Sequence, residues 1–149
     1  SIRDAYSKEL VAMGTEAVAV ERQKGWIGAS ENIQFAAWDW DDGRHRTIYL
    51  LNIDWWSNKT SAPCKLLLAG QEFKLNVRRR FIEVVTNYKG LAVMPKSMQT
   101  DVMKIENNNN GYTITVQTTG PDELTIYNQE KKSKTTYKIS NAGIHEIRI

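Results

Sequence analysis

The sequence contains one cysteine in 149 residues, which excludes an internal disulfide. Cysteine usage therefore does not fix the redox compartment of the protein. Cys64 lies in Pro63-Cys64-Lys65-Leu66, which we interpret as the start of a strand. Neither His45 nor His145 is linked to Cys64 by a local pattern, so the sequence does not indicate a catalytic thiol.

Long hydrophobic runs are also absent. No apolar run approaches the roughly 20 residues that span a bilayer, so we expect no membrane partner. Residues 1–20 lack the continuous apolar region of a signal peptide. A segment cut from a longer chain would show the same absence.

The motifs of common catalytic sites are missing too: there is no phosphate-cradling glycine motif, no metal-spaced histidine and cysteine cluster, and no nucleophile elbow. Asp39, Asp41 and Asp42 precede Gly43, which resembles part of a calcium loop, but a tight turn explains the spacing better. We therefore predict no catalytic residue, no cofactor and no metal ligand, and the presence of calcium is left open. The rival enzyme hypothesis depends on a cleft that contains Asp39 or Asp54.

What is present is an ordinary globular composition, with 41% hydrophobic and 25% charged residues, and this length and composition predict one well-buried core. The net charge of +3 and the pI near 9.0 favour anionic partners only weakly. A nucleic-acid domain usually has a denser basic stripe, so we do not expect nucleic acid as a partner.

Two apolar runs, residues 33–38 and 47–53, flank the polar turn Asp41-Asp42-Gly43-Arg44, a pattern typical of a hairpin. Apolar side chains fall on both alternating sets of each run, which predicts that both faces of the hairpin are covered. We expect residues 33–40 and 47–53 to pair centrally in a sheet.

About ten short β-type runs, spaced 8–12 residues apart, predict an all-β fold, a mostly antiparallel β-sandwich. Near the start of the chain, helical spacing predicts a short N-terminal helix over residues 1–14, with the β-sandwich domain over residues 15–149. The apolar positions of that helix are Ile2, Ala5, Tyr6, Leu10 and Met13. The expected core includes Phe35, Ile48, Leu50, Leu67, Val84, Ile114, Ile126 and Ile147.

A candidate carbohydrate site follows the hairpin, where Trp55 and Trp56 lie beside Asp54 and Asn58. Aromatic rings stack on sugar rings, and carboxylate and amide groups bind hydroxyls, so these four residues and Tyr49 are the predicted site. Adjacent strand residues point to opposite faces, so both indoles can serve one platform only if this segment is a loop.

The densest positive patch surrounds the Arg78-Arg79-Arg80 run. We predict that Arg78, Arg80 and Lys74 are the candidate residues for an anionic ligand, such as an acidic polysaccharide or a phosphate. The alternative, which we favour, is a solvated strand end that protects a sheet edge.

A resemblance extends over about residues 15–149. It is carried by Asn32-Ile33-Gln34-Phe35-Ala36-Ala37-Trp38-Asp39, by Arg46-Thr47-Ile48-Tyr49-Leu50-Leu51-Asn52-Ile53-Asp54-Trp55, by Gly70, and by Asn141-Ala142-Gly143-Ile144-His145-Glu146-Ile147. The order of these segments resembles the C-terminal β-sandwich accessory domain of large bacterial polysaccharide-degrading enzymes, glycoside hydrolases especially.

The resemblance implies a non-catalytic module that packs against a preceding catalytic domain of the same polypeptide, with weak polysaccharide contact left open. It also implies a periplasmic or extracellular location, and an N-terminal helix that is the tail of the catalytic domain. Three alternatives remain open: an autonomous carbohydrate-binding module, a small enzyme, and a domain that binds an anionic polymer. We favour packing over autonomous carbohydrate binding. The expected packing surface is an apolar patch formed by Trp55, Trp56 and the N-terminal helix, because tryptophan is enriched in interface cores.

Overall fold

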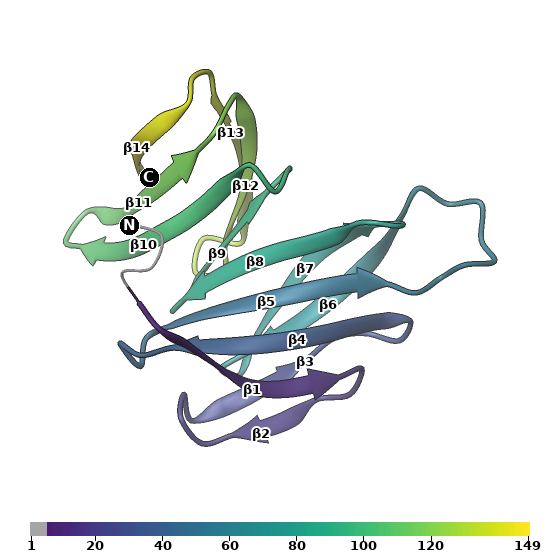
Figure 1. Ribbon diagram of the computed structural model, residues 1–149. Coiled ribbons are helices and arrows are strands. Elements are labelled where there is room, and N and C mark those ends of the chain that lie inside the picture. Colours follow the sequence, from purple (N-terminus) through teal and green to yellow (C-terminus); the bar gives the residue numbers. More distant parts are fainter. Residues whose placement is uncertain (1–5) are drawn as a thin grey trace.

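The computed structural model describes residues 6–149, which form an all-β fold of fourteen strands with no helix (Figure 1). It follows that no helix in this range could span a membrane. The strands are β1 (Lys8–Gly14), β2 (Val18–Val20), β3 (Gly25–Gly28), β4 (Ile33–Trp40), β5 (His45–Asn52), β6 (Ser61–Leu68), β7 (Gln71–Arg78), β8 (Ile82–Tyr88), β9 (Leu91–Pro95), β10 (Thr100–Asn108), β11 (Gly111–Thr118), β12 (Asp122–Asn128), β13 (Ser133–Ile139) and β14 (Gly143–Arg148).

The strands form three sheets, and neighbouring strands within each sheet are antiparallel. The seven-stranded sheet has the order β1-β4-β5-β8-β9-β12-β13, the four-stranded sheet β2-β3-β6-β7, and the three-stranded sheet β10-β11-β14. The prediction of an all-β, antiparallel fold is confirmed. The strand count exceeds the expected one partly because β3 has only four residues, too few to show a clear alternation.

The predicted hairpin is formed by β4 and β5 and lies inside the seven-stranded sheet. Its register pairs Ile33 with Asn52 and Asp39 with Arg46, and β1 and β8 pair with its outer sides. Gly43 in the connecting turn has φ 68°, a left-handed conformation that glycine adopts without a steric penalty. The hairpin and its central position are therefore confirmed.

Strand β9 shows that the seven-stranded sheet carries a hydrophobic core on each face. Successive side chains of a strand point to opposite faces. Leu91 and Val93 belong to one buried cluster, whereas Ala92 and Met94 belong to the other. The four-stranded sheet supplies the rest of the cluster around Ala92, and the three-stranded sheet supplies part of the cluster around Leu91.

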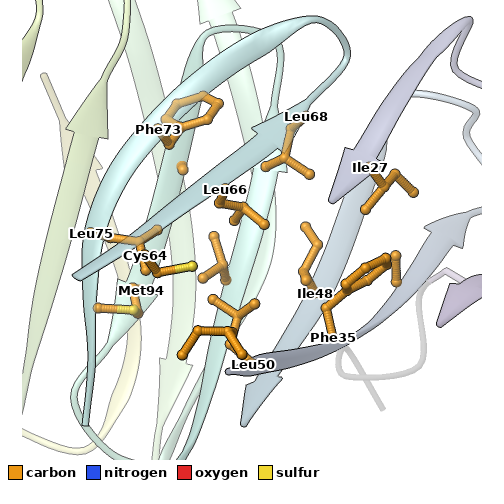
Figure 2. Packing of buried hydrophobic residues seen from close by; sticks show 14 of the residues in the cluster. Ile27, Phe35, Ile48, Leu50, Cys64, Leu66, Leu68, Phe73, Leu75 and Met94 are labelled. Atoms are coloured by element: carbon orange, nitrogen blue, oxygen red, sulfur yellow. The ribbon is translucent and has the colours of Figure 1, made fainter. Parts of the chain in front are cut away.

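The larger cluster lies between the hairpin and the four-stranded sheet (Figure 2). Phe35 and Ile48 of the hairpin pack in the same cluster as Ile27, Leu66 and Phe73 of the four-stranded sheet. Because the clustered positions alternate along β4, β5, β6 and β7, the period-two pattern of the sequence determines which face is buried.

The predicted core is mostly correct. The buried members are Phe35, Ile48, Leu50, Ile114, Ile126 and Ile147. The prediction was wrong for Leu67 and Val84, which are only partly buried. Leu66 and Val85 are the neighbours that enter the larger cluster, so Leu67 and Val84 point to the opposite faces of their sheets.

The predicted N-terminal helix is wrong where the structure describes it. Lys8–Gly14 is strand β1, which pairs with β4, and Met13 lies opposite Ala36. The predicted helical positions Ile2 and Ala5 lie outside the described residues. Pairing with the otherwise open edge of β4 satisfies the backbone groups of residues 8–14, and this tertiary interaction outweighs the weak helical spacing.

Candidate functional site

The two tryptophans of the predicted carbohydrate site lie on the tryptophan loop, residues 53–60, which joins β5 to β6. Figure 1 shows this connection extending away from the sheets, on the right of the view. Trp55 is 56% exposed and Trp56 is 73% exposed. Because the segment is a loop, the condition under which both indoles can serve one platform is met.

Arg79 holds the tryptophan loop in place. Its backbone N–H donates to the Thr60 carbonyl at 2.9 Å, and its Nη2 donates to the Trp55 carbonyl at 2.6 Å. Its Nη1 donates to the carbonyl of Ser57. Three carbonyl groups of the loop are thus bound by one residue, so the loop is folded around Arg79.

Asp54 forms hydrogen bonds that stabilise the tryptophan loop itself. Its Oδ1 accepts a hydrogen bond of 3.1 Å from the Ser57 backbone N–H, and its own N–H donates to Asn52 Oδ1 at 3.0 Å. Asn52 is buried, and its Nδ2 donates to the Val77 carbonyl of β7 at 3.2 Å. The structure therefore places Asp54 as a support of the loop, with Asn58 exposed beyond it.

Tyr49 lies on β5 and lines a cavity of about 720 Å³ together with Arg78. Neither tryptophan of the loop lines this cavity. The structure thus brings Tyr49 together with a member of the predicted anionic-ligand patch. The cavity also has an apolar lining that includes Phe81, Ile82 and Met98.

Arg78 already has partners within the chain. Its Nε donates to Glu83 Oε1 at 2.8 Å, its guanidinium carbon lies 4.4 Å from the centroid of the Phe81 ring, and its Nη2 donates to the Lys96 carbonyl. Glu83 is buried, so this ion pair is shielded from solvent on one side. The charge of Arg78 is therefore largely compensated.

The other two cations of the predicted patch lie elsewhere. Lys74 is exposed on β7 and lines a separate cavity with Glu72, whereas Arg80 is exposed in the turn after β7, with φ 64°. The structure does not gather Arg78, Arg80 and Lys74 around one ligand position. Arg79, which the sequence analysis did not assign to any site, is the member of the run that organises the loop.

A second surface is the part of the seven-stranded sheet, on the face opposite the larger cluster, that the three-stranded sheet leaves exposed. We call this part the uncovered face and define it by Leu10, Met13, Tyr49 and Ile82. These four side chains are exposed, and they come from β1, β5 and β8. The register places Met13 opposite Ala36, Ala36 opposite Tyr49, and Tyr49 opposite Val84, so these residues share the face opposite the larger cluster. The expectation that both faces of the hairpin are covered is wrong here.

His45 and Asp42 resemble a catalytic pair, but both ring nitrogens of His45 already have hydrogen-bond partners within the protein. Nδ1 lies 2.5 Å from Asp42 Oδ2, and Nε2 accepts a hydrogen bond of 2.9 Å from the backbone N–H of Ile105. The ring stacks on Trp40 at a centroid distance of 4.3 Å, and Tyr88 lies 4.8 Å away. This arrangement joins β5 to β10.

The environment shifts the pKa of both partners. Burial lowers the pKa of His45 below its usual value, although the hydrogen bond and charge of Asp42 oppose this shift. Burial acts to raise the pKa of Asp42, but hydrogen bonds from the backbone of Arg44 and from His45 outweigh it and lower the pKa. The neutral imidazole and the carboxylate are therefore the favoured forms near neutral pH.

The aspartates of the predicted tight turn have different structural roles. Asp39 is buried on β4 and binds Arg46 through two hydrogen bonds, of 2.6 Å to Nε and 3.2 Å to Nη2. Asp42 binds the backbone N–H groups of Arg44 and His45 within the turn. Among residues 6–149, no group of three or more histidine, cysteine, aspartate or glutamate side chains is placed to hold a metal ion.

Cys64 lies in the larger hydrophobic cluster, where burial raises the pKa of its thiol. The thiolate is the reactive form of cysteine, so the environment of Cys64 disfavours reactivity. Cys64 was expected at the start of a strand; it lies on β6, but inside the strand, which begins at Ser61.

These features define an all-β protein with a fixed tryptophan loop and an uncovered apolar sheet face. Comparison of the chain with protein-family models, with curated proteins and with solved structures gives no match.

Proposed function

We propose that this chain is a non-catalytic β-sandwich accessory module of a polysaccharide-degrading enzyme, which packs against the catalytic domain through the uncovered face. The observation that carries the proposal is the gathering of Leu10, Met13, Tyr49 and Ile82 on one face of neighbouring strands. Contiguous exposed apolar surface is typical of a protein interface. The resemblance of the segment order to such accessory domains supplies the kind of partner.

The chemistry of the uncovered face supports a protein occupant better than a sugar. Leu10, Met13 and Ile82 are flexible or branched aliphatic side chains, which pack well against other apolar side chains. Sugar sites depend on flat aromatic rings with polar groups around them, and this description fits the tryptophan loop instead. The two surfaces therefore suit different partners.

Thermal unfolding of two forms of the protein tests the proposal. The chain alone is compared with the parent polypeptide that carries the proposed catalytic domain. We expect a higher midpoint for this module in the parent, and we expect Ile82→Lys to return the midpoint to that of the isolated chain, because a buried unpaired charge disrupts an apolar interface.

Ile144→Lys is the matched control. Ile144 is 50% exposed on β14 of the three-stranded sheet, close to the 54% of Ile82, but it lies outside the uncovered face. We expect it to leave the midpoint in the parent unchanged. Equal midpoints for the wild-type module in isolation and in the parent would refute packing through the uncovered face.

A further inference from the structure

The tryptophan loop is ordered in a way that keeps its indoles in water. The polar groups of Asn52, Asp54 and Arg79 bind the backbone of the loop or of its neighbour β7, while Trp55 and Trp56 are exposed. Leaving indoles in solvent forgoes the favourable burial of apolar area. Because the loop is already ordered, less conformational entropy is lost when a ligand binds. Both features suit a ligand site.

The charges at the loop favour an anion. Lys59 is exposed on the loop, Arg79 lies under it, and Arg80 is exposed directly after Arg79. The carboxylate on the loop is Asp54, which is partly buried and bonded to Ser57. A ligand with carboxylate groups would therefore meet an excess of positive charge beside the two indoles.

We propose that the tryptophan loop binds an acidic saccharide. The indoles of Trp55 and Trp56 stack on the sugar rings, and Lys59 and Arg80 pair with the carboxylates of the sugar. Arg79 is a positioning residue, because its guanidinium is bonded to the loop carbonyls. The site involves none of the four residues of the uncovered face, so it does not depend on packing against a catalytic domain.

A single-stranded nucleic acid also combines aromatic stacking with positive charge, but it needs a cationic groove along its backbone. The neighbouring strand β7 does not provide such a groove. Glu72 and Lys74 alternate with Asn76 on its exposed side, and Arg78 is paired with Glu83. Glu72 and Asn76 therefore interrupt the positive charge along β7, which favours a short acidic saccharide over a polynucleotide.

Calorimetric titration of the chain tests the proposal with tetrasaccharides of galacturonate, mannuronate and chondroitin sulfate. A fully methyl-esterified galacturonate tetrasaccharide is the uncharged probe of matched ring structure, and a ten-residue oligothymidylate is the nucleic-acid probe. We expect at least one acidic tetrasaccharide to bind, and the ester and the oligothymidylate to bind at least tenfold more weakly. No binding of any acidic probe, or equal or tighter binding of the ester or the oligothymidylate, overturns the proposal.

Variants connect the binding to the loop. Trp55→Ala and Trp56→Ala should each weaken it about tenfold or more, consistent with the loss of an aromatic stacking partner. Trp26→Ala should leave it unchanged, since Trp26 is 52% exposed on β3 of the four-stranded sheet. Equal losses for all three variants contradict a site at the loop.

The positioning role of Arg79 has its own test. Arg79→Met should weaken binding of the acidic probe, and Arg79→Lys should restore part of the affinity by supplying a donor to the loop carbonyls. Failure of the lysine to restore any affinity contradicts this role. Ile82→Lys should leave saccharide binding intact, so failure of the loop site and failure of packing through the uncovered face are distinguishable.

Discussion

His45 and Ile105 are joined across two sheets, because Nε2 of the imidazole accepts the backbone N–H of Ile105 at 2.9 Å. Asp42 binds the other ring nitrogen and so holds a proton on Nδ1. A protonated imidazole carries hydrogen on both nitrogens and cannot accept this bond. The contact between β5 and β10 therefore requires neutral His45.

The stability of the fold should consequently fall in mild acid. The pKa of His45 is lowered in the folded protein, so between that pKa and the usual value near 6.5 the unfolded chain binds more protons. The free energy of unfolding then decreases as the pH falls below about 6.5. Urea unfolding at pH 7.5 and 5.5 should show this decrease.

The variant His45→Gln provides the comparison, because its amide oxygen can accept a hydrogen bond but does not titrate. Its stability should change less than that of the wild type between the two pH values. The prediction fails if the wild type and the variant lose the same stability over this interval.

The hairpin was predictable because its signal is local and strong. Two apolar runs around Asp41-Asp42-Gly43-Arg44 indicate β4 and β5 without information from any other segment of the chain. The β10–β11 hairpin has a similar local signal, because four asparagines precede Gly111 and two of them form its tip between Asn108 and Gly111. Local turn chemistry thus identified the main pairings of neighbouring strands.

Long-range pairing was not predictable from local patterns. Lys8–Gly14 becomes a strand only because β4 offers an edge, and a helical spacing of a few apolar residues could not reveal that edge. The same error hid the uncovered face, since Leu10 and Met13 had been assigned to a helix. Arg79 was missed because its role comes from carbonyls of another segment, residues 55–60.

The buried pair Asp39 and Arg46 gives a prediction about stability. Both side chains are fully buried, so removing one partner leaves an unpaired charge in the core region. Arg46→Met should lower the free energy of unfolding by about 3–5 kcal/mol, measured by urea unfolding.

The double variant Asp39→Leu/Arg46→Met removes both charges and should be more stable than Arg46→Met alone. A double variant that is less stable than the single variant would show that the pair does not act as a coupled unit.

The alternation of side chains along β5 and β6 predicts that alanine substitutions of two leucines will lower the stability by different amounts. Leu50→Ala should destabilise the protein by about 2–5 kcal/mol, because Leu50 is fully buried in the larger cluster. Leu67→Ala should cost less than about 1 kcal/mol, because Leu67 lies on the outer side of β6. Equal costs in chemical denaturation would contradict the assignment of faces.

The loop around Arg79 should resist proteolysis. Trypsin can cleave after Lys59, which is exposed, but the loop must first unfold locally to fit the active site of the protease. Arg79→Met removes the hydrogen bonds to the Trp55 and Ser57 carbonyls and should accelerate this cleavage severalfold, as followed by mass spectrometry. Arg80→Met is the matched control, and equal acceleration by both variants would disprove the anchoring role.

Oxidation of the four methionines tests packing through the uncovered face most directly. Met13 lies on that face and Met98 lines the adjoining cavity, and both are exposed, whereas Met94 and Met103 are buried. In the isolated chain, peroxide should oxidise Met13 and Met98 much faster than the buried pair. In the parent polypeptide with the proposed catalytic domain, we expect Met13 and Met98 to become protected, with Met94 and Met103 unchanged. Equally fast oxidation of Met13 and Met98 in both forms would contradict the proposal that the uncovered face packs against that domain.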